Sequence, residues 1–332
     1  MYDFIFLKVG YMKKYCLFII ILMLSTPLYA DNNSQGAPLT NIQDYPEDLS
    51  PVIKAINSGN YENALKEIEA LAPVIKTNKK GKKKIITKDV PPEKKKYLKG
   101  IALLKLGKFA EAKQALKESL ALRGSNGDTV AELAFANLAL GEYDKALQNF
   151  KEALWLDNMK EHSPADIYYQ IGFIYQSKDD TEVATENYKK ALDINNTHIM
   201  SSIKLAELSF ANGEKKRAVK LLRHLCEKGI ATNEAKRLLA TMLLTNVDPL
   251  IDGSDIKYAL EIIKPIFESS NKDTHYKDPA FPVYIKALLL SDELNTAEEE
   301  IQLALKKDKN NPNLQRLIQQ IELEKSAQKP AN

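Results

Sequence analysis

The chain has 332 residues, of which 44% are hydrophobic and 27% are charged, and its 47 basic and 44 acidic side chains leave a formal net charge of +3. This composition excludes a disordered chain and a multi-spanning membrane protein, and the length suits about two ordinary domains or one repeat array. The near balance of charge gives no overall reason to expect a nucleic acid as partner, and we expect none. Two cysteines are too few for a disulfide framework.

A secretory signal peptide is predicted at residues 1–30. Lys13 and Lys14 precede the apolar run 16–24, and small and polar residues follow that run as far as Ala30. This order is typical of a cleaved signal, and the apolar run is too short to cross a bilayer as a helix. We expect cleavage after Ala30, a periplasmic or secreted mature protein, and no integral membrane segment after cleavage.

The mature chain is expected to begin at Asp31 with a flexible lead over residues 31–44. Leu28 is larger than the small residue preferred at its place in a cleavage site. The alternative of an uncleaved signal that anchors the protein in a membrane therefore stays open. Either Met1 or Met12 is the start of translation.

A short pattern recurs along the chain with a period of about 34 residues. A glycine is followed by an aromatic residue and then by an alanine, as in Gly107 to Ala112 and Gly141 to Ala146, and Asp179 takes the place of glycine in another copy. Residues three, four and seven apart share one face of a helix, so the apolar residues after each alanine form the buried face of the second helix of a pair. The alanine lets two helices approach closely, and the glycine ends the first helix.

This pattern resembles the tetratricopeptide repeat over about residues 45–325, most strongly over 93–226. Its small-large-small signature is matched by Ala134, Gly141, Tyr143, Ala146, Phe150 and Ala153. The resemblance implies an all-α fold, a right-handed α-solenoid superhelix of about seven antiparallel helix pairs. A lysine-rich insertion at residues 76–96 separates the first two pairs, and a polar tail is expected at residues 326–332.

The resemblance also implies that the first helix of each pair lines a concave groove. The groove positions are apolar or aromatic in this chain: Tyr97, Ile101, Leu104, Phe135, Leu138, Tyr169, Phe173, Ile203 and Phe210. Relatives that hold the carboxylate at the end of a peptide use Lys, Asn and Arg at such positions, and this chain lacks that set. The groove is therefore suited to an apolar peptide or a partner helix. The alternative is that some of these residues pack against neighbouring helices.

The lysine-rich insertion has two interpretations. Its centre holds Lys79, Lys80, Lys82, Lys83 and Lys84. Blocks of like charge repel one another and resist packing, which favours a solvated, mobile insertion. The alternative is a patch for an anionic partner, such as a lipid headgroup, an envelope polymer or an acidic protein face. No aromatic residue alternates with these lysines, which argues against single-stranded nucleic acid.

Sequence patterns that carry catalytic, metal or phosphate chemistry are missing, and the four histidines are scattered singly. We expect no enzyme activity, no cofactor and no metal. The leading hypothesis is an exported, non-catalytic scaffold or adaptor that binds a protein or peptide partner in bacterial envelope assembly or secretion. One alternative is an accessory protein that binds the cell wall or an anionic surface polymer through the lysine-rich insertion. Another is an inert helper domain of an enzyme complex.

Overall fold

The protein is represented by a computed structural model, which describes Leu39 and residues 45–71, 74–77, 83–86, 90–247, 253–271 and 274–328. The predicted signal peptide, and the predicted lead apart from Leu39, lie outside these residues. The chain divides into two compact units, with the boundary between His198 and Ile199. Each unit is described by itself.

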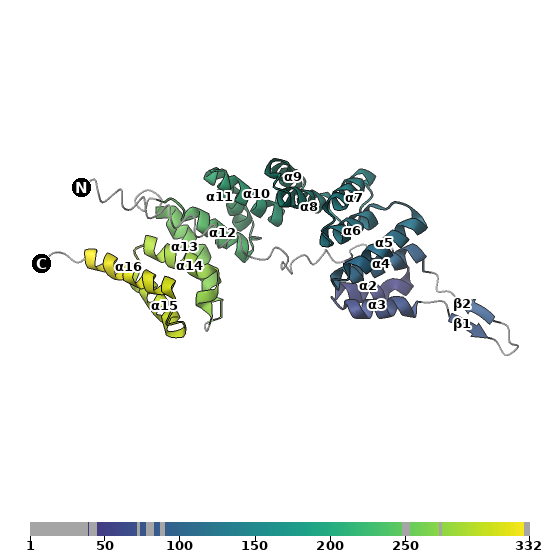
Figure 1. Cartoon of the computed structure of the whole chain (residues 1–332), viewed down its shortest axis with the longest axis horizontal. Coiled ribbons are helices and arrows are strands. Elements are labelled where there is room, and N and C mark those ends of the chain that lie inside the picture. Colours follow the sequence, from purple (N-terminus) through teal and green to yellow (C-terminus); the bar gives the residue numbers. More distant parts are fainter. Residues whose placement is uncertain are drawn as a thin grey trace. The chain divides into compact units, whose positions relative to one another are not determined.

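The N-terminal unit is a series of helix pairs (Figure 1). A short 3-10 helix, η2 (Glu47–Leu49), comes first. The pairs are α2 (Ser50–Asn57) with α3 (Tyr61–Ala70), α4 (Pro92–Lys105) with α5 (Phe109–Arg123), α6 (Gly127–Ala139) with α7 (Tyr143–Leu156), and α8 (Pro164–Ser177) with α9 (Thr181–Ile194). In each of the last three pairs a tight turn reverses the chain, so that the two helices run antiparallel and pack along each other. The predicted all-α repeat fold is confirmed.

The turns within the pairs use the left-handed backbone that the sequence pattern predicts. Gly141 has a φ of 73°, and Asp179 has a φ of 61° at the equivalent place. After Gly141, the amide of Glu142 donates a hydrogen bond to the carbonyl of Asn137 at 2.8 Å. This bond satisfies a carbonyl at the end of the helix, as expected where a left-handed residue follows the last turn. A glycine adopts this conformation without strain, whereas Asp179 adopts it at a small cost.

Small residues allow the two helices of a pair to touch. Ala146 on α7 is completely buried. A Cβ atom added to Gly172 on α8 would lie 2.7 Å from the buried ring of Tyr188 on α9, and one added to Gly100 on α4 would lie 2.6 Å from Leu116 on α5. These distances are shorter than any ordinary carbon–carbon contact, so the small residues are a requirement of the packing.

Ala146→Leu is expected to destabilise the protein by about 1–3 kcal/mol, because the added methylenes must push α7 away from its partner. The exposed Gln148 lies on the same helix, so Gln148→Leu is the matched control and should change stability by less than about 0.5 kcal/mol. Urea unfolding of both variants measures the difference. Equal effects of the two substitutions would contradict this packing.

The C-terminal unit continues the same architecture (Figure 1). Its helices are α10 (Ile199–Ala211), α11 (Lys215–Glu227), α12 (Asn233–Leu243), α13 (Gly253–Glu268), α14 (Ala280–Leu290), α15 (Leu294–Lys307) and α16 (Pro312–Gln328), with the 3-10 helix η3 (His275–Lys277) before α14. The Lys215 ammonium donates to the carbonyl of Thr245 at 2.7 Å, which satisfies an acceptor just beyond the end of α12.

The last helix, α16, covers one side of this unit. Leu314 and Ile321 are buried in the core of the unit, and Lys325 forms an ion pair with Glu298 on α15. The helix continues to Gln328, so the predicted polar tail starts too early at residue 326. A terminal helix with one apolar and one polar face is what a repeat array needs at its open end.

The lysine-rich insertion contains a β-hairpin that the sequence analysis did not predict. Strand β1 (Val74–Thr77) pairs antiparallel with β2 (Lys83–Ile86), with Val74 opposite Ile86 and Lys76 opposite Lys84. Valine and isoleucine favour extended backbone, which explains why strands form on both sides of the lysine block. The insertion also ends earlier than predicted, because α4 begins at Pro92.

The predicted flexible lead is anchored at one residue. Leu39 is buried in the core of the N-terminal unit. Its backbone amide donates to Oδ1 of Asn57 at 3.0 Å, and Nδ2 of Asn57 donates to the carbonyl of Leu39 at 3.3 Å. The expectation of a free lead is therefore wrong at Leu39, because burial of a leucine and two hydrogen bonds fix it to α2.

Candidate partner-binding face and cleft

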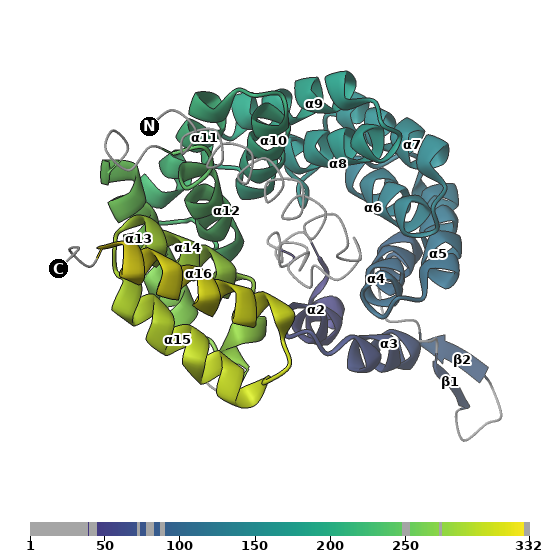
Figure 2. The same cartoon turned by 60° about the vertical axis from the view of Figure 1, so that its left-hand side comes forward.

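Within the N-terminal unit, α4, α6 and α8 lie on the inner side of an arc, and α5, α7 and α9 lie on its outer side (Figure 2). The predicted groove residues of this unit are on the inner helices. Two of them do not form an open apolar surface as the sequence analysis expected: Tyr97 is only 7% exposed and Ile101 only 4% exposed, and the apolar parts of both belong to the core shared with α2 and α5. Ile203 is completely buried in the C-terminal unit, so its assignment to a groove is also wrong.

The other predicted groove residues are half-buried: Leu104, Phe135, Leu138, Tyr169, Phe173 and Phe210. Most of them contact neighbouring side chains. The ring of Phe135 meets that of Phe150 edge-on at 5.1 Å, and the ring of Tyr169 lies 5.8 Å from that of Tyr188. Among the described residues, Phe173 on α8 is half-buried without belonging to any of the buried apolar clusters. Phe173 is therefore the clearest candidate for contact with a partner.

The rings of two histidines lie against two of the predicted aromatic residues, in a repeated arrangement that the sequence analysis missed. Nε2 of His162 lies 3.2 Å from Oε1 of Glu132, and its ring lies 5.5 Å from that of Phe135.

The next repeat has the same arrangement. Nε2 of His198 lies 2.9 Å from Oδ1 of Asp166, and its ring lies 5.7 Å from that of Tyr169. The acid and the aromatic residue each recur with the repeat period of about 34 residues, which is the signal that could have revealed the arrangement. Each pair of acid and histidine joins the first helix of a repeat to the segment that follows its second helix, and this contact stabilises the edge of the inner face.

The ionisation of His162 is set by its surroundings. Burial opposes protonation of the imidazole, but the hydrogen bond with Glu132 and the negative charges of Glu132, Asp128 and Asp166 outweigh that effect. The pKa of His162 is therefore raised above its ordinary value of 6.5. The folded chain therefore binds this proton more tightly than the unfolded chain does.

Glu132→Gln is expected to lower the pKa of His162, because it removes the acceptor and its charge. The stabilisation from protonated His162 is complete below the unfolded pKa and is lost as pH rises through the raised pKa of the folded state. A rise in pH from about 6 to about 8 should therefore destabilise the wild type more than the variant.

NMR titration of the His162 ring and melting temperatures at both pH values measure the effect. The matched control is Glu182→Gln, at an exposed site on α9. A pKa that Glu132→Gln leaves unchanged would contradict the pairing.

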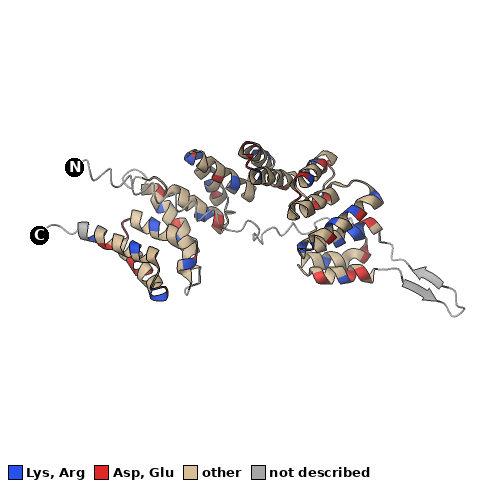
Figure 3. Ribbon diagram, viewed as in Figure 1, with Lys and Arg blue, Asp and Glu red and all other residues tan. Residues whose placement is uncertain are grey.

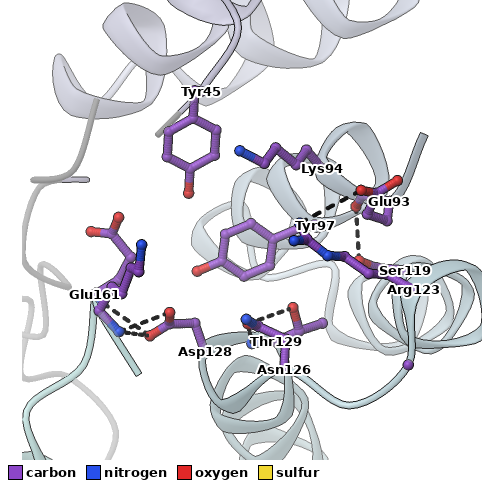
Figure 4. A pocket seen from close by; sticks show the side chains of 12 residues that line it. Tyr45, Glu93, Lys94, Tyr97, Ser119, Arg123, Asn126, Asp128, Thr129 and Glu161 are labelled. Carbon is purple, nitrogen blue, oxygen red and sulfur yellow. Dashed lines mark hydrogen bonds and ion pairs between the residues drawn. The ribbon is translucent and has the colours of Figure 1, made fainter. Parts of the chain in front are cut away.

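A cleft of about 340 Å³ lies in the N-terminal unit between Tyr45, the helices α4 and α5, the start of α6 and the loop after α7 (Figure 4). Its lining is mainly polar and contains both basic and acidic side chains. Several of these groups maintain the structure. Both oxygens of Asp128 accept hydrogen bonds from the backbone amide of Lys160, and Oδ1 also accepts one from the amide of Glu161. Oδ1 of Asn126 accepts from the amide of Thr129 and caps α6.

The hydroxyl of Tyr97 is the exception in this cleft. It is buried and has no hydrogen-bond partner, and the ring points toward the space between Tyr45, Asp128 and Glu161 (Figure 4). Burial raises the pKa of Tyr97 well above its ordinary value, and the negative charges of Glu132, Asp128 and Glu161 add to this effect. The phenol therefore keeps its proton and can both donate and accept a hydrogen bond.

The predicted lysine patch is only partly described. Lys79, Lys80 and Lys82 lie outside the described residues, and Lys83 and Lys84 are in strand β2. On the helices, basic and acidic residues are interspersed in both units (Figure 3).

Sequence analysis also missed Trp155, the one tryptophan of the chain, which is 82% exposed near the end of α7. Leu122 and Ile194 are half-exposed near the ends of α5 and α9. Single exposed apolar side chains are ordinary on protein surfaces, so these three residues by themselves indicate no binding site. None of the described helices has the length and apolar character needed to cross a membrane.

Comparison with known proteins identifies the repeats. Residues 96–126 and 165–198 match the tetratricopeptide repeat, and both matches fall in the N-terminal unit. The chain is 39% identical over 80 residues to the Photosystem I assembly protein Ycf3 of Rippkaea orientalis, a match that covers 23% of this chain and 44% of that protein. The match thus spans less than half the length of this relative.

Solved structures share the fold. The APC/C hetero-tetramer Cut9-Hcn1 contains a chain with a TM-score of 0.52 and 13% identity, over 84% of this chain and 50% of that one. PilF of Pseudomonas aeruginosa has a TM-score of 0.51 and 14% identity, over 69% of this chain and 93% of that one. The chain therefore contains tetratricopeptide repeats in an all-α repeat fold.

Proposed function

We propose that the protein is an exported, non-catalytic scaffold that binds an apolar segment of a partner protein on the inner helices of its N-terminal unit. The observation that carries this proposal is the half-buried Phe173 on the inner helix α8, inside one of the two matched repeats. Tetratricopeptide repeats are protein-binding scaffolds, and aromatic anchors of this kind supply much of the binding energy at protein interfaces. An extended peptide or a partner helix is the expected occupant.

A role in assembly is supported by the relative that matches over 80 residues, since its name describes it as an assembly protein. Export is supported by the basic, apolar and small residues of segment 1–30. Together they favour a scaffold in bacterial envelope assembly or secretion. The place of action is then the periplasm or the cell exterior.

If the protein is exported and processed, the mature N-terminus should be Asp31. The measurement is N-terminal sequencing of the protein released from cells by osmotic shock. An N-terminus at Met1 or Met12 on membrane-bound protein would contradict cleavage and favour the anchored alternative. Either result decides whether the apolar run is a leader or an anchor.

A second candidate function is binding of an anionic envelope polymer by the lysine-rich insertion. The register of the hairpin favours this alternative, because it places Lys76 directly opposite Lys84. Like charges directly opposite each other destabilise a strand pair, and an anion between them would relieve the repulsion. Salt separates the two functions, since an apolar contact persists at high salt while lysine contacts are screened.

Phe173→Ala should weaken partner binding by about 2 kcal/mol, which is about thirtyfold, and leave the melting temperature nearly unchanged. The partner is first identified with a photo-crosslinking amino acid at position 173, and position 143 on the outer helix α7 is the control. The purified partner is then titrated at low and high salt against Phe173→Ala, Tyr143→Ala and a variant that neutralises residues 82–84.

Loss of affinity with Phe173→Ala alone supports the groove. Loss with the lysine variant alone, and only at low salt, would replace the groove by the polymer-binding function. A large fall in melting temperature for Phe173→Ala would show that this ring belongs to the core instead.

A further inference from the structure

The cleft at Tyr97 has the size and position of a site for one side chain. Its volume of about 340 Å³ is at the lower end of the range for small-molecule pockets. It lies at the N-terminal ends of the inner helices α4 and α6, and part of its lining belongs to the first of the two matched repeats. A partner that lies along the inner face can therefore place one long side chain in it.

The hydroxyl of Tyr97 serves no purpose in the fold. Among the described residues it is one of a few buried polar atoms without a hydrogen-bond partner. A phenylalanine would fill the same space without burying a polar group. A buried hydroxyl of this kind, aimed into a cleft, indicates that a ligand supplies the missing partner (Figure 4).

Acceptor groups dominate the space that this hydroxyl faces. The carboxylates of Asp128 and Glu161 and the ring of Tyr45 surround it (Figure 4). Asp128 accepts hydrogen bonds from the backbone amides of Lys160 and Glu161, and these amides carry no net charge. The Glu132 carboxylate, which pairs with His162, adds to the negative potential at the phenol.

Three basic residues line the cleft, Lys94, Arg123 and Lys160, and the first two contact neighbouring side chains of the lining. Arg123 lies 3.7 Å from the carboxylate of Glu93, and its side chain is largely exposed. The Lys94 ammonium lies 4.8 Å from the centre of the Tyr45 ring. This contact shows that the face of Tyr45 attracts a cation.

We propose that the cleft receives a basic side chain, a guanidinium or a primary ammonium, from the partner polypeptide. This inference rests on the proposed function and names the polar group that the partner brings to the inner face. The phenol oxygen of Tyr97 and the carboxylates of Asp128 and Glu161 accept hydrogen bonds from the cation. Hydrogen bonds to a charged group are the stronger kind, and a single cation can satisfy several acceptors at once.

The test uses the full chain and three fluorescein-labelled peptides of one design, acetyl-Gly-Gly-X-Gly-Gly-amide, with arginine, citrulline or glutamate at X. Citrulline keeps the shape of arginine and removes its charge. Fluorescence anisotropy should show binding of the arginine peptide, with at least tenfold weaker binding of the other two.

Tyr97→Phe should weaken binding of the arginine peptide by about tenfold, because one hydrogen bond to a charged group is lost. Its melting temperature should stay the same or rise, since the hydroxyl has no partner in the fold. Tyr143→Phe, which alters an exposed tyrosine on α7, is the matched control and should change neither quantity.

Tighter binding of the glutamate peptide would overturn the inference and make the cleft an anion site. Equal binding of the arginine peptide by wild type, Tyr97→Phe and Tyr143→Phe would also overturn it, because the peptide would then bind elsewhere. A third outcome separates this inference from the proposed function. If no peptide binds but Phe173→Ala still weakens binding of the protein partner, the cleft is rejected as a site and the proposed function stands. If no peptide binds and Phe173→Ala also leaves the affinity for the protein partner unchanged, the proposed function is rejected as well.

Discussion

The structure depends on how closely the two helices of each pair can approach. Ala146 is completely buried between helices, and a Cβ on Gly172 would lie 2.7 Å from the ring of Tyr188. Isolated helices of this length are marginal in water, so each helix is stabilised mainly by the apolar face that its partner covers. A larger residue at the contact would separate these faces along the whole pair. The small residue is therefore needed for the two helices to close, and stacking of neighbouring pairs buries the remaining apolar surface in a continuous core.

The same close packing limits the surface that is left for a partner. Ile101 is used in the core of the N-terminal unit, and the rings of Phe135 and Tyr169 lie against His162 and His198. A position that faces inward on the first helix of a pair is thus not always a position that a partner can reach. What remains on the inner helices is a smaller set of side chains, with Phe173 as its apolar member.

The repeating part of the fold could be predicted from the sequence because every repeat obeys one local rule. The turn at Gly141 follows from that rule, and the turn at Asp179 follows even without a glycine. The burial of Tyr97 and Ile203 could not be predicted, because helix periodicity gives the direction of a side chain but not what lies opposite it. The β-hairpin could not be predicted either, because a lysine block favours a solvated segment, whereas the β-branched residues on either side of it, such as Val74, favour strands.

The polar groups in the cleft at Tyr97 differ in whether the fold needs them. The buried polar groups around it have structural roles: Asp128 holds the loop after α7, and Asn126 caps α6. The Tyr97 hydroxyl has no such role, although its ring packs in the core. Sequences depart from the most stable choice mainly where function requires it. This departure lies in a cleft at the ends of the inner helices, within a matched tetratricopeptide repeat, and it is the feature on which the proposed binding of a partner's basic side chain depends.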